Sequence, residues 1–134
     1  MKISTRGRYA LRVMVDLAEH SGNGYVPLKE IVERQEVSQK YLEGIMTDLS
    51  KAGLVAAVHG KGGGYKLLRP SEDYSVGEIL RVTEGDLAPI SCLSSGAEKC
   101  NRAENCKTLP MWKKLYEMLN GFFDGVSLKD LMQN

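Results

Sequence analysis

Two short helical segments, separated by about three residues, constrain the fold of this chain more than any other feature. Apolar residues recur at helical spacing in residues 28–34 and again in residues 38–52. Pro27 suits the start of the first segment, Ser38 is a favourable N-cap for the second, and Gly53 stops the second pattern. The sequence therefore predicts a helix-turn-helix.

The segment that follows the second helix favours a β-hairpin. Residues 54–58 and 65–68 are strand-like, and residues 59–64 between them are rich in glycine, which is typical of a turn. A hairpin directly after a helix-turn-helix is a wing. Such a winged unit places one helix in the major groove of DNA and its hairpin against the backbone or the minor groove.

The N-terminal half of the chain is basic. Residues 1–69 hold 11 Lys and Arg against 7 Asp and Glu, whereas residues 70–134 hold 7 against 10. An apolar stripe predicts a first helix over residues 5–20, and its polar faces carry Arg8 and Asp16 among other charged residues. The charge split points weakly to a surface that binds a polyanion, because a solvated surface alone also produces such a split.

Further helices are expected after the hairpin. Ser75 and Glu78 have the spacing of a capping box, which opens a helix that reaches about residue 84. A long helix over residues 110–124 and a short last helix capped by Ser127 follow a loop. We expect a mainly α fold with a small β wing, in three parts: a winged helix-turn-helix domain at 1–84, a cysteine-containing loop at 85–109, and the long and short helices at 110–134.

Length and composition narrow the class of protein. The 134 residues are 43% hydrophobic and 26% charged, ordinary values for a globular domain that buries its core without disulfides. No apolar run approaches the roughly 18 residues of a membrane span, and the N-terminus lacks the apolar core of a signal peptide. We expect a cytoplasmic protein without a membrane partner, and we exclude multidomain enzymes, collagen-like chains and disordered tails.

The candidate DNA contacts lie at the start of the second helix of the pair and at the wing. Ser and Gln side chains read base edges, Lys pairs with phosphate or guanine, and a carboxylate accepts from cytosine or rejects wrong sequences. The alternative is a winged helix that serves only as a protein–protein module. The full candidate set is Arg8, Lys29, Ser38, Gln39, Lys40, Tyr41, Glu43, His59, Lys61 and Gly62.

Two features that resemble enzyme motifs do not carry catalytic chemistry. The run Gly60–Gly64 lacks the spacing of nucleotide-binding loops and leads into a strand rather than a helix. His20 and His59 are accompanied by neither a serine elbow nor a His-Glu zinc motif. We therefore expect a protein that is not an enzyme.

Three cysteines, Cys92, Cys100 and Cys106, lie within fifteen consecutive positions of the expected loop. Their odd number and the reducing compartment argue against a disulfide framework. Wide spacing in a loop suits thiolates that converge on an iron–sulfur cluster, and the paired C-x2-C knuckles of zinc sites are absent. Free thiols and a redox pair are the alternatives that the spacing leaves open.

The chain resembles the Rrf-type family of winged-helix transcription factors, and in particular its iron–sulfur cluster regulators. The resemblance runs over nearly the whole chain, and a glycine-rich wing followed by three cysteines is specific to this family. The stretches that carry it are Lys2–Ala10, Tyr41–Glu43, Gly53–Val55, Gly62–Tyr65, Val76–Ile79, the three cysteines and Trp112.

The resemblance implies a homodimeric regulator that binds double-stranded DNA. The helix at 110–124 would pair with its copy, and the three cysteines would hold a 2Fe–2S or 4Fe–4S cluster whose state alters DNA binding. Ordering of the cysteine loop would then bias the dimer helix and the two recognition helices. Two other classes remain: a cluster-free regulator controlled by thiol redox or by a partner protein, and a cluster or metal carrier without a DNA role.

Three positions depart from the family pattern. His59 stands where the wing commonly presents an arginine to the minor groove. Leu109 stands where a histidine completes the ligand set in the iron–sulfur cluster regulators, and Arg8 stands where nitric-oxide-sensing relatives have an aspartate. The fourth ligand is therefore open, and the candidates are Glu98, Glu104, Asn105, a solvent molecule or a small thiol.

Overall fold

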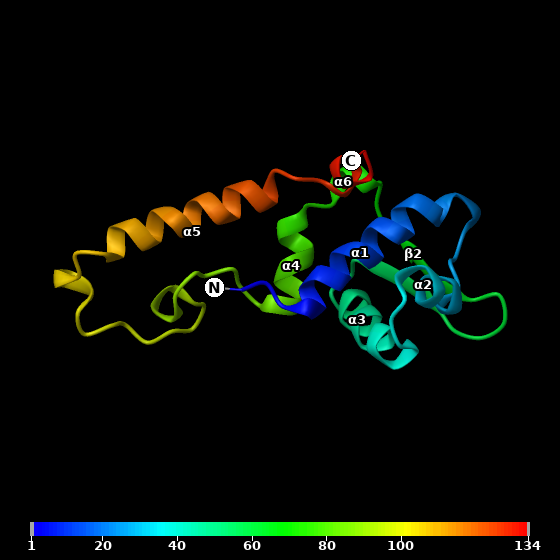
Figure 1. The fold of residues 1–134 in the computed structure, drawn as a ribbon, viewed down its shortest axis with the longest axis horizontal. Coiled ribbons are helices and arrows are strands. Elements are labelled where there is room, and N and C mark those ends of the chain that lie inside the picture. The colour runs from blue at the N-terminus through cyan, green and yellow to red at the C-terminus, as the bar shows by residue number, and fades with distance from the viewer. Residues whose placement is uncertain (1, 134) are drawn as a thin grey trace.

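The structure, a computed structural model, describes residues 2–133. Six α-helices and a two-stranded antiparallel sheet make up its regular part (Figure 1). Val55 pairs with Leu67 and Val58 with Gly64, so the hairpin that was predicted is present. The elements are α1 (Thr5–His20), α2 (Leu28–Gln35), α3 (Gln39–Lys51), β1 (Val55–Val58), β2 (Gly64–Leu67), α4 (Val76–Glu84), α5 (Leu109–Asp124) and α6 (Leu128–Met132).

The main hydrophobic core lies around α1. Met14 and Leu17 of α1 are fully buried, as are Ile45 and Leu49 of α3, because the apolar stripes of the two helices face each other. Leu128 of α6 is also fully buried in this core, and α6 packs against α1. The last helix of the chain therefore belongs to the same core as the winged helix-turn-helix. The mainly α fold with a small β wing that the sequence predicts is confirmed.

Serine N-caps begin four of the helices. The hydroxyl oxygen of Ser75 accepts the amide N–H of Glu78 at 3.0 Å, as the expected capping box requires. The Glu78 carboxylate binds Arg69 at 2.6 Å, so its side chain takes a tertiary partner. A complete capping box forms instead at Ser127 and Asp130. The Asp130 carboxylate accepts the amide N–H of Ser127, and the Ser127 hydroxyl accepts the amide N–H of Asp130.

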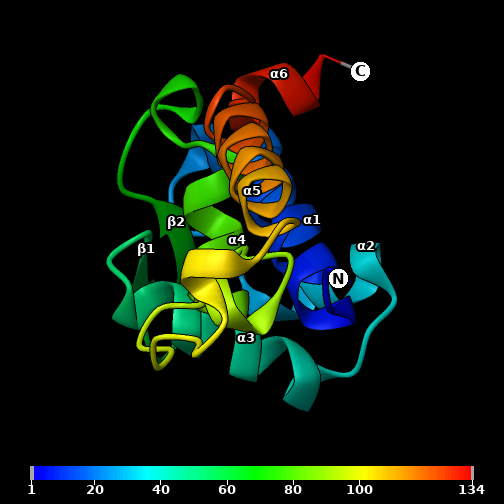
Figure 2. The same cartoon turned by 90° about the vertical axis from the view of Figure 1, so that its left-hand side faces the viewer.

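α5 extends away from the rest of the molecule (Figures 1 and 2). It packs against α4, and the loop 85–108 runs from the end of α4 to the far end of α5, so that α4, the loop and α5 form a triangle (Figure 1). Within residues 2–133, no helix is both long enough and apolar enough to cross a lipid bilayer.

Candidate DNA interface and cysteine cavity

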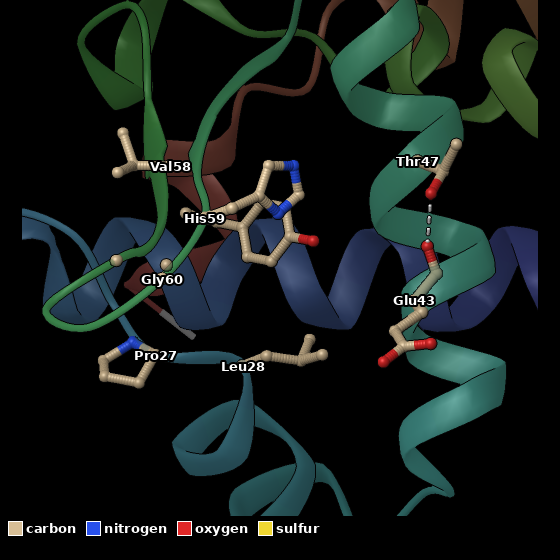
Figure 3. A pocket seen from close by; sticks show the side chains of 10 residues that line it. Pro27, Leu28, Glu43, Thr47, Val58, His59 and Gly60 are labelled. Atoms are coloured by element: carbon tan, nitrogen blue, oxygen red, sulfur yellow. Dashed lines mark hydrogen bonds between the residues drawn. The ribbon is translucent and has the colours of Figure 1, made fainter.

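A cleft of about 470 Å³ lies between α3, the wing and the start of α2 (Figure 3). Glu43 and Thr47 of α3 line one wall, and His59 at the end of β1 lines the opposite wall. The helix-turn-helix and the wing thus border a single surface, which we call the α3–wing cleft. Its lining residues are Pro27, Leu28, Glu43, Thr47, Val58, His59, Gly60, Gly63, Gly64 and Tyr65.

The first turns of α3 hold their polar side chains in a defined arrangement. The hydroxyl oxygen of Ser38 accepts the amide N–H of Tyr41 at 3.1 Å, so the residue is the N-cap that its position predicts. The Gln39 amide donates to the Glu43 carboxylate at 3.1 Å, which orients both side chains along one face of α3. Lys40 lies beside them and is exposed.

The wing turn places His59, Lys61 and Gly62 on the exposed surface. The backbone geometry of this turn requires glycine at two positions. Gly62 has φ of 80°, a backbone conformation that strongly favours glycine, and a Cβ at Gly63 would collide with the carbonyl of Val58. The glycine-rich run therefore makes a tight turn that presents His59 and Lys61.

Of the ten candidates only Glu43 and His59 line the α3–wing cleft, and Arg8, Lys29 and Tyr41 are among the eight that lie outside its lining. Arg8 is exposed near the start of α1, where it donates to the Thr5 hydroxyl at 3.0 Å, and Lys29 is exposed in the first turn of α2. Tyr41 is half-buried, and its ring meets that of Tyr9 edge to face, with centroids 6.0 Å apart. Tyr41 thus joins α3 to α1.

Asp16 is a buried side chain that the sequence analysis placed on a polar face, which is wrong. Its side chain is 2% exposed, because Arg34 and Gln35 at the end of α2 close over it. Arg34 donates to the two carboxylate oxygens at 2.7 and 2.9 Å, and Gln35 donates at 2.9 Å. Burial by itself raises the pKa of Asp16, but these hydrogen bonds and the Arg34 charge outweigh it and lower the pKa.

A relay of side-chain contacts leads from this buried carboxylate to α3. The side-chain oxygen of Gln35 accepts from Arg12 at 2.9 Å, and the Arg12 guanidinium lies over the ring of Tyr9 at 5.3 Å. Tyr9 in turn contacts Tyr41 of α3. The relay connects α1, α2 and α3 to one another. No local pattern in the sequence predicts these contacts.

The three cysteines line one cavity of about 280 Å³ at the N-terminal end of α5, which we call the cysteine cavity. Cys92 and Cys100 are exposed and Cys106 is half-buried. The amide N–H of Arg102 donates to the Cys100 sulfur at 3.4 Å. The remaining lining residues are Leu93, Lys99, Ala103, Leu109 and Lys113.

The donor set of the cysteine cavity fits an iron–sulfur cluster, which is held by cysteine thiolates. In residues 2–133, no group of three His, Cys, Asp or Glu side chains is close enough to ligate one ion. Three thiols around a larger cavity, with an N–H donor to one sulfur and two lysines nearby, suit an anionic cluster of several atoms. Hydrogen bonds with Thr108 lower the pKa of the Cys106 thiol, which favours the thiolate form.

None of the side chains proposed as the fourth cluster ligand lines the cysteine cavity. Leu109, which departs from the expected family pattern, lines the cysteine cavity together with the three cysteines. Glu98, Glu104 and Asn105 are exposed and are not part of its lining, and Glu104 pairs with Lys99 at 3.9 Å. A small molecule therefore remains as a candidate for the fourth ligand.

The loop around the cysteines is tied down at its start. The carboxylate of Asp86 accepts amide N–H groups of Ala88 at 3.1 Å and of Ser95 at 2.7 Å. These backbone hydrogen bonds, with Ser95 first, lower the pKa of Asp86. The sequence analysis did not single out this residue, although Asp near the end of a helix is a typical turn former.

The fold and the α3–wing cleft define a DNA-binding transcription regulator of the winged-helix class. The family model described as "Rrf2: Iron-dependent Transcriptional regulator" matches residues 3–134, and the chain belongs to this Rrf2 family. Within the family it is an IscR-like regulator. The resemblance found in the sequence is thus confirmed.

The relatives agree with this assignment. The HTH-type transcriptional regulator IscR of Aliivibrio salmonicida is 40% identical over 98% of this chain and 77% of its own length. The structure of T. potens IscR superposes with a TM-score of 0.75 at 38% identity, covering 99% of this chain and 87% of that one. CymR, the global cysteine regulator of B. subtilis, superposes with a TM-score of 0.79 at 33% identity, covering 99% and 97%.

Proposed function

We propose that this protein is a homodimeric regulator whose DNA binding is controlled by an iron–sulfur cluster held by Cys92, Cys100 and Cys106. The observation that carries the proposal is the convergence of all three thiols on one cavity. Similar regulators named IscR support it. When bound, a cluster of the 2Fe–2S or 4Fe–4S type supplies a redox-sensitive group that oxidants or nitric oxide can modify.

The residues of the α3–wing cleft and its surroundings do the DNA binding in this proposal. Ser38, Gln39 and Glu43 read base edges in the major groove, because they lie on one face of the first turns of α3. Lys40 and the wing residues His59 and Lys61 bind the backbone or the minor groove. Arg8, Lys29, Tyr41 and Gly62 complete the proposed interface, within a DNA-binding part at residues 1–84.

Homodimerisation through α5 is part of the same proposal. α5 buries none of its residues, and Met111, Met118 and Phe122 are 55%, 60% and 66% exposed. Large apolar side chains in this number on one helix favour a partner surface, and a second copy of α5 offers the same apolar chemistry. Beyond the winged helix, the proposed parts are the cysteine loop at 85–109 and residues 110–134, in which α5 pairs with its copy and α6 packs against α1.

In this proposal, the cysteine loop acts on DNA binding through the triangle that it forms with α4 and α5. An unconstrained loop carries conformational entropy, and tying three of its side chains to one point restricts its conformations. Because the loop joins the ends of α4 and α5, its order biases the position of α5 relative to the winged helix. Order in the cysteine loop thereby shifts the population of dimers among their possible geometries.

The test is anaerobic purification, followed by a visible absorption spectrum and by iron and sulfide counts per chain. We expect a coloured protein with matched iron and sulfide, and loss of colour in Cys100→Ala but not in the matched loop variant Ser91→Ala. Binding to promoter DNA should fall steeply with salt and should differ between the loaded and the cluster-free protein. A protein that cannot be loaded by anaerobic reconstitution would refute the cluster.

Thiol chemistry without a cluster is the second candidate. Cys92 and Cys100 are exposed and the pKa of Cys106 is lowered, which are the properties of thiols that react with oxidants. The similarity to Staphylococcus aureus CymR in its oxidised form, at 34% identity and a TM-score of 0.78, favours the same alternative. An iron-free protein whose DNA affinity changes after mild oxidation of these thiols would support it over the cluster.

A further inference from the structure

α5 is attached to the rest of the molecule near its C-terminal end. After α5, the chain returns to the core, where the amide N–H of Val76 donates to the carbonyl of Val126 at 2.8 Å and that of Leu128 to Tyr74 at 3.1 Å. The 16 residues of α5 span about 24 Å. A small rotation about the attached end therefore displaces the far end, which carries the cysteine cavity, by a large distance.

One side chain of α4 binds two side chains of α5 near this attached end. Arg81 donates to both carboxylate oxygens of Asp124, at 2.8 and 3.0 Å, and to the side-chain oxygen of Asn120 at 2.8 Å. Asn120 and Asp124 are four residues apart and thus lie on the same face of α5. We call Arg81, Asn120 and Asp124 the Arg81 clamp.

The close approach of the two helices at the Arg81 clamp depends on Gly77. A Cβ at this position would collide with the Asp124 carboxylate and would lie 3.0 Å from the Arg81 guanidinium. Gly77 is one turn before Arg81 on α4, so the absence of a side chain makes the space in which the ion pair forms.

The Arg81 clamp fixes the orientation of α5 relative to α4 but adds little to the stability of their packing. The side chains of Arg81 and Asp124 are 34% and 47% exposed, and such exposed ion pairs add little to the free energy of unfolding. The packing of α5 on α4 is stabilised mainly by an apolar cluster in which buried Leu80 and Leu87 contact Phe123. Apolar contact is non-directional, whereas a guanidinium that binds both oxygens of a carboxylate fixes the orientation of its partner.

We infer that the Arg81 clamp sets the distance between the two recognition helices of the dimer, and with it the spacing of the two DNA half-sites that the dimer accepts. The inference rests on the proposed function, namely DNA binding by a dimer that pairs through α5. Each recognition helix α3 belongs to the body of its subunit, and the dimer surface belongs to α5. The angle between α4 and α5 therefore enters the spacing twice, once in each subunit, and dimeric helix-turn-helix proteins read half-sites at a fixed separation.

The experiment compares wild type with Arg81→Gln on DNA of defined spacing. A duplex is selected from a randomised library with the wild-type protein and is then resynthesised with its half-sites moved by one or two base pairs, or with one half-site deleted. Kd is measured for each duplex by fluorescence anisotropy, and sedimentation gives the oligomeric state. Lys129→Gln is the matched control, because it removes an exposed cation of α6 that lies outside α5 and outside the candidate DNA contacts.

We expect wild type and the control to lose about tenfold or more in affinity when the spacing changes. Arg81→Gln should remain dimeric, should bind the single half-site within about twofold of wild type, and should lose most of this spacing preference. The charge-exchanged double variant Arg81→Glu with Asp124→Arg should restore part of the preference. A merely structural role would instead lower affinity for all duplexes alike.

The outcomes separate the inference from the proposed function. If Arg81→Gln is dimeric and keeps the full spacing preference of wild type, the inference is wrong and the proposed function stands. If wild type selects only a single half-site, both the dimeric mode of binding and the inference are wrong. If Arg81→Gln does not fold, Asp124→Asn replaces it, because the amide keeps its size and loses the charge that pairs with Arg81.

Discussion

The phenol of Tyr74 lies 2.6 Å from the carbonyl oxygen of Leu54, to which it donates a hydrogen bond at the entry to the wing. The phenol oxygen of Tyr74 in turn accepts the amide N–H groups of Leu68 and Arg69, at 2.9 and 3.1 Å, where the chain leaves the wing. One buried hydroxyl thus ties together the two ends of the hairpin that forms a wall of the α3–wing cleft.

Replacement of Tyr74 by Phe should destabilise the protein by about 1–3 kcal/mol, because it leaves three backbone groups without their partner. It should also weaken DNA binding, since the base of the wing is loosened. Urea denaturation measures the first effect and anisotropy the second. The control is Tyr25→Phe, because the Tyr25 hydroxyl makes no hydrogen bond within residues 2–133; a Tyr74→Phe variant as stable as this control would contradict the prediction.

Asp16→Asn should lower the free energy of unfolding by about 1–2 kcal/mol at neutral pH, because the uncharged amide pairs less strongly with Arg34. The pKa of Asp16 is lowered in the folded protein, so its contribution is present above the unfolded pKa of about 3.9 and is lost as pH falls through the folded pKa. The difference between the two proteins should therefore be constant above about pH 5 and shrink toward zero in acid.

Urea denaturation at a series of pH values checks this prediction. Glu19→Gln, an exposed carboxylate on the same helix, is the control and should change stability by less than about 0.5 kcal/mol at any pH. A difference between Asp16→Asn and wild type that persists unchanged in acid would show that side-chain shape, and not charge, accounts for the effect.

Lys40→Ala should weaken DNA binding by about five- to tenfold at moderate salt, because Lys40 is exposed beside the residues proposed to read bases. If it binds a phosphate, the loss is similar for all sequences and the slope of log Kd against log salt flattens by about 1. Anisotropy titrations at several salt concentrations measure both quantities. Lys51→Ala, at the other end of α3, should change neither, and equal effects of the two variants would remove Lys40 from the interface.

Glu43→Gln should broaden sequence choice. The carboxylate faces the α3–wing cleft, where in the proposed complex it would repel phosphates and accept from a donor base. The amide keeps the hydrogen bond from Gln39 and loses the charge. The ratio of Kd values for a scrambled and a selected duplex should fall about tenfold relative to wild type. Glu33→Gln, exposed on α2, is the control, and an unchanged ratio in Glu43→Gln would refute the discriminating role.

The elements could be predicted because their signals are local. Residues 28–34 and 38–52 were expected to be helical, and α2 and α3 span Leu28–Gln35 and Gln39–Lys51. An N-cap serine or a glycine in a tight turn depends on hydrogen bonds and steric limits within a few residues of the chain. Such signals survive in any tertiary context, which is why the boundaries agree to within one or two residues.

The failures involve residues whose partners are distant in sequence. Asp16 has the periodicity of a polar face, and its burial follows from Arg34 and Gln35, two residues of another helix. Glu78 fits a capping box, but Arg69 competes for its carboxylate. The convergence of the cysteines could not be derived from spacing, because an irregular loop has no periodicity that fixes side-chain directions.

Leu109→His should stabilise a cluster in the cysteine cavity. Leu109 lines this cavity with all three cysteines, so an imidazole at the same position can supply a nitrogen donor beside the thiols. After anaerobic reconstitution, the visible absorption of the variant should decay at least about threefold more slowly under a chelator than that of wild type. Leu109→Ala is the control, because it removes the leucine without adding a donor, and it should not slow the decay. A variant that shows the wild-type spectrum and the wild-type decay would mean that position 109 does not reach the cluster.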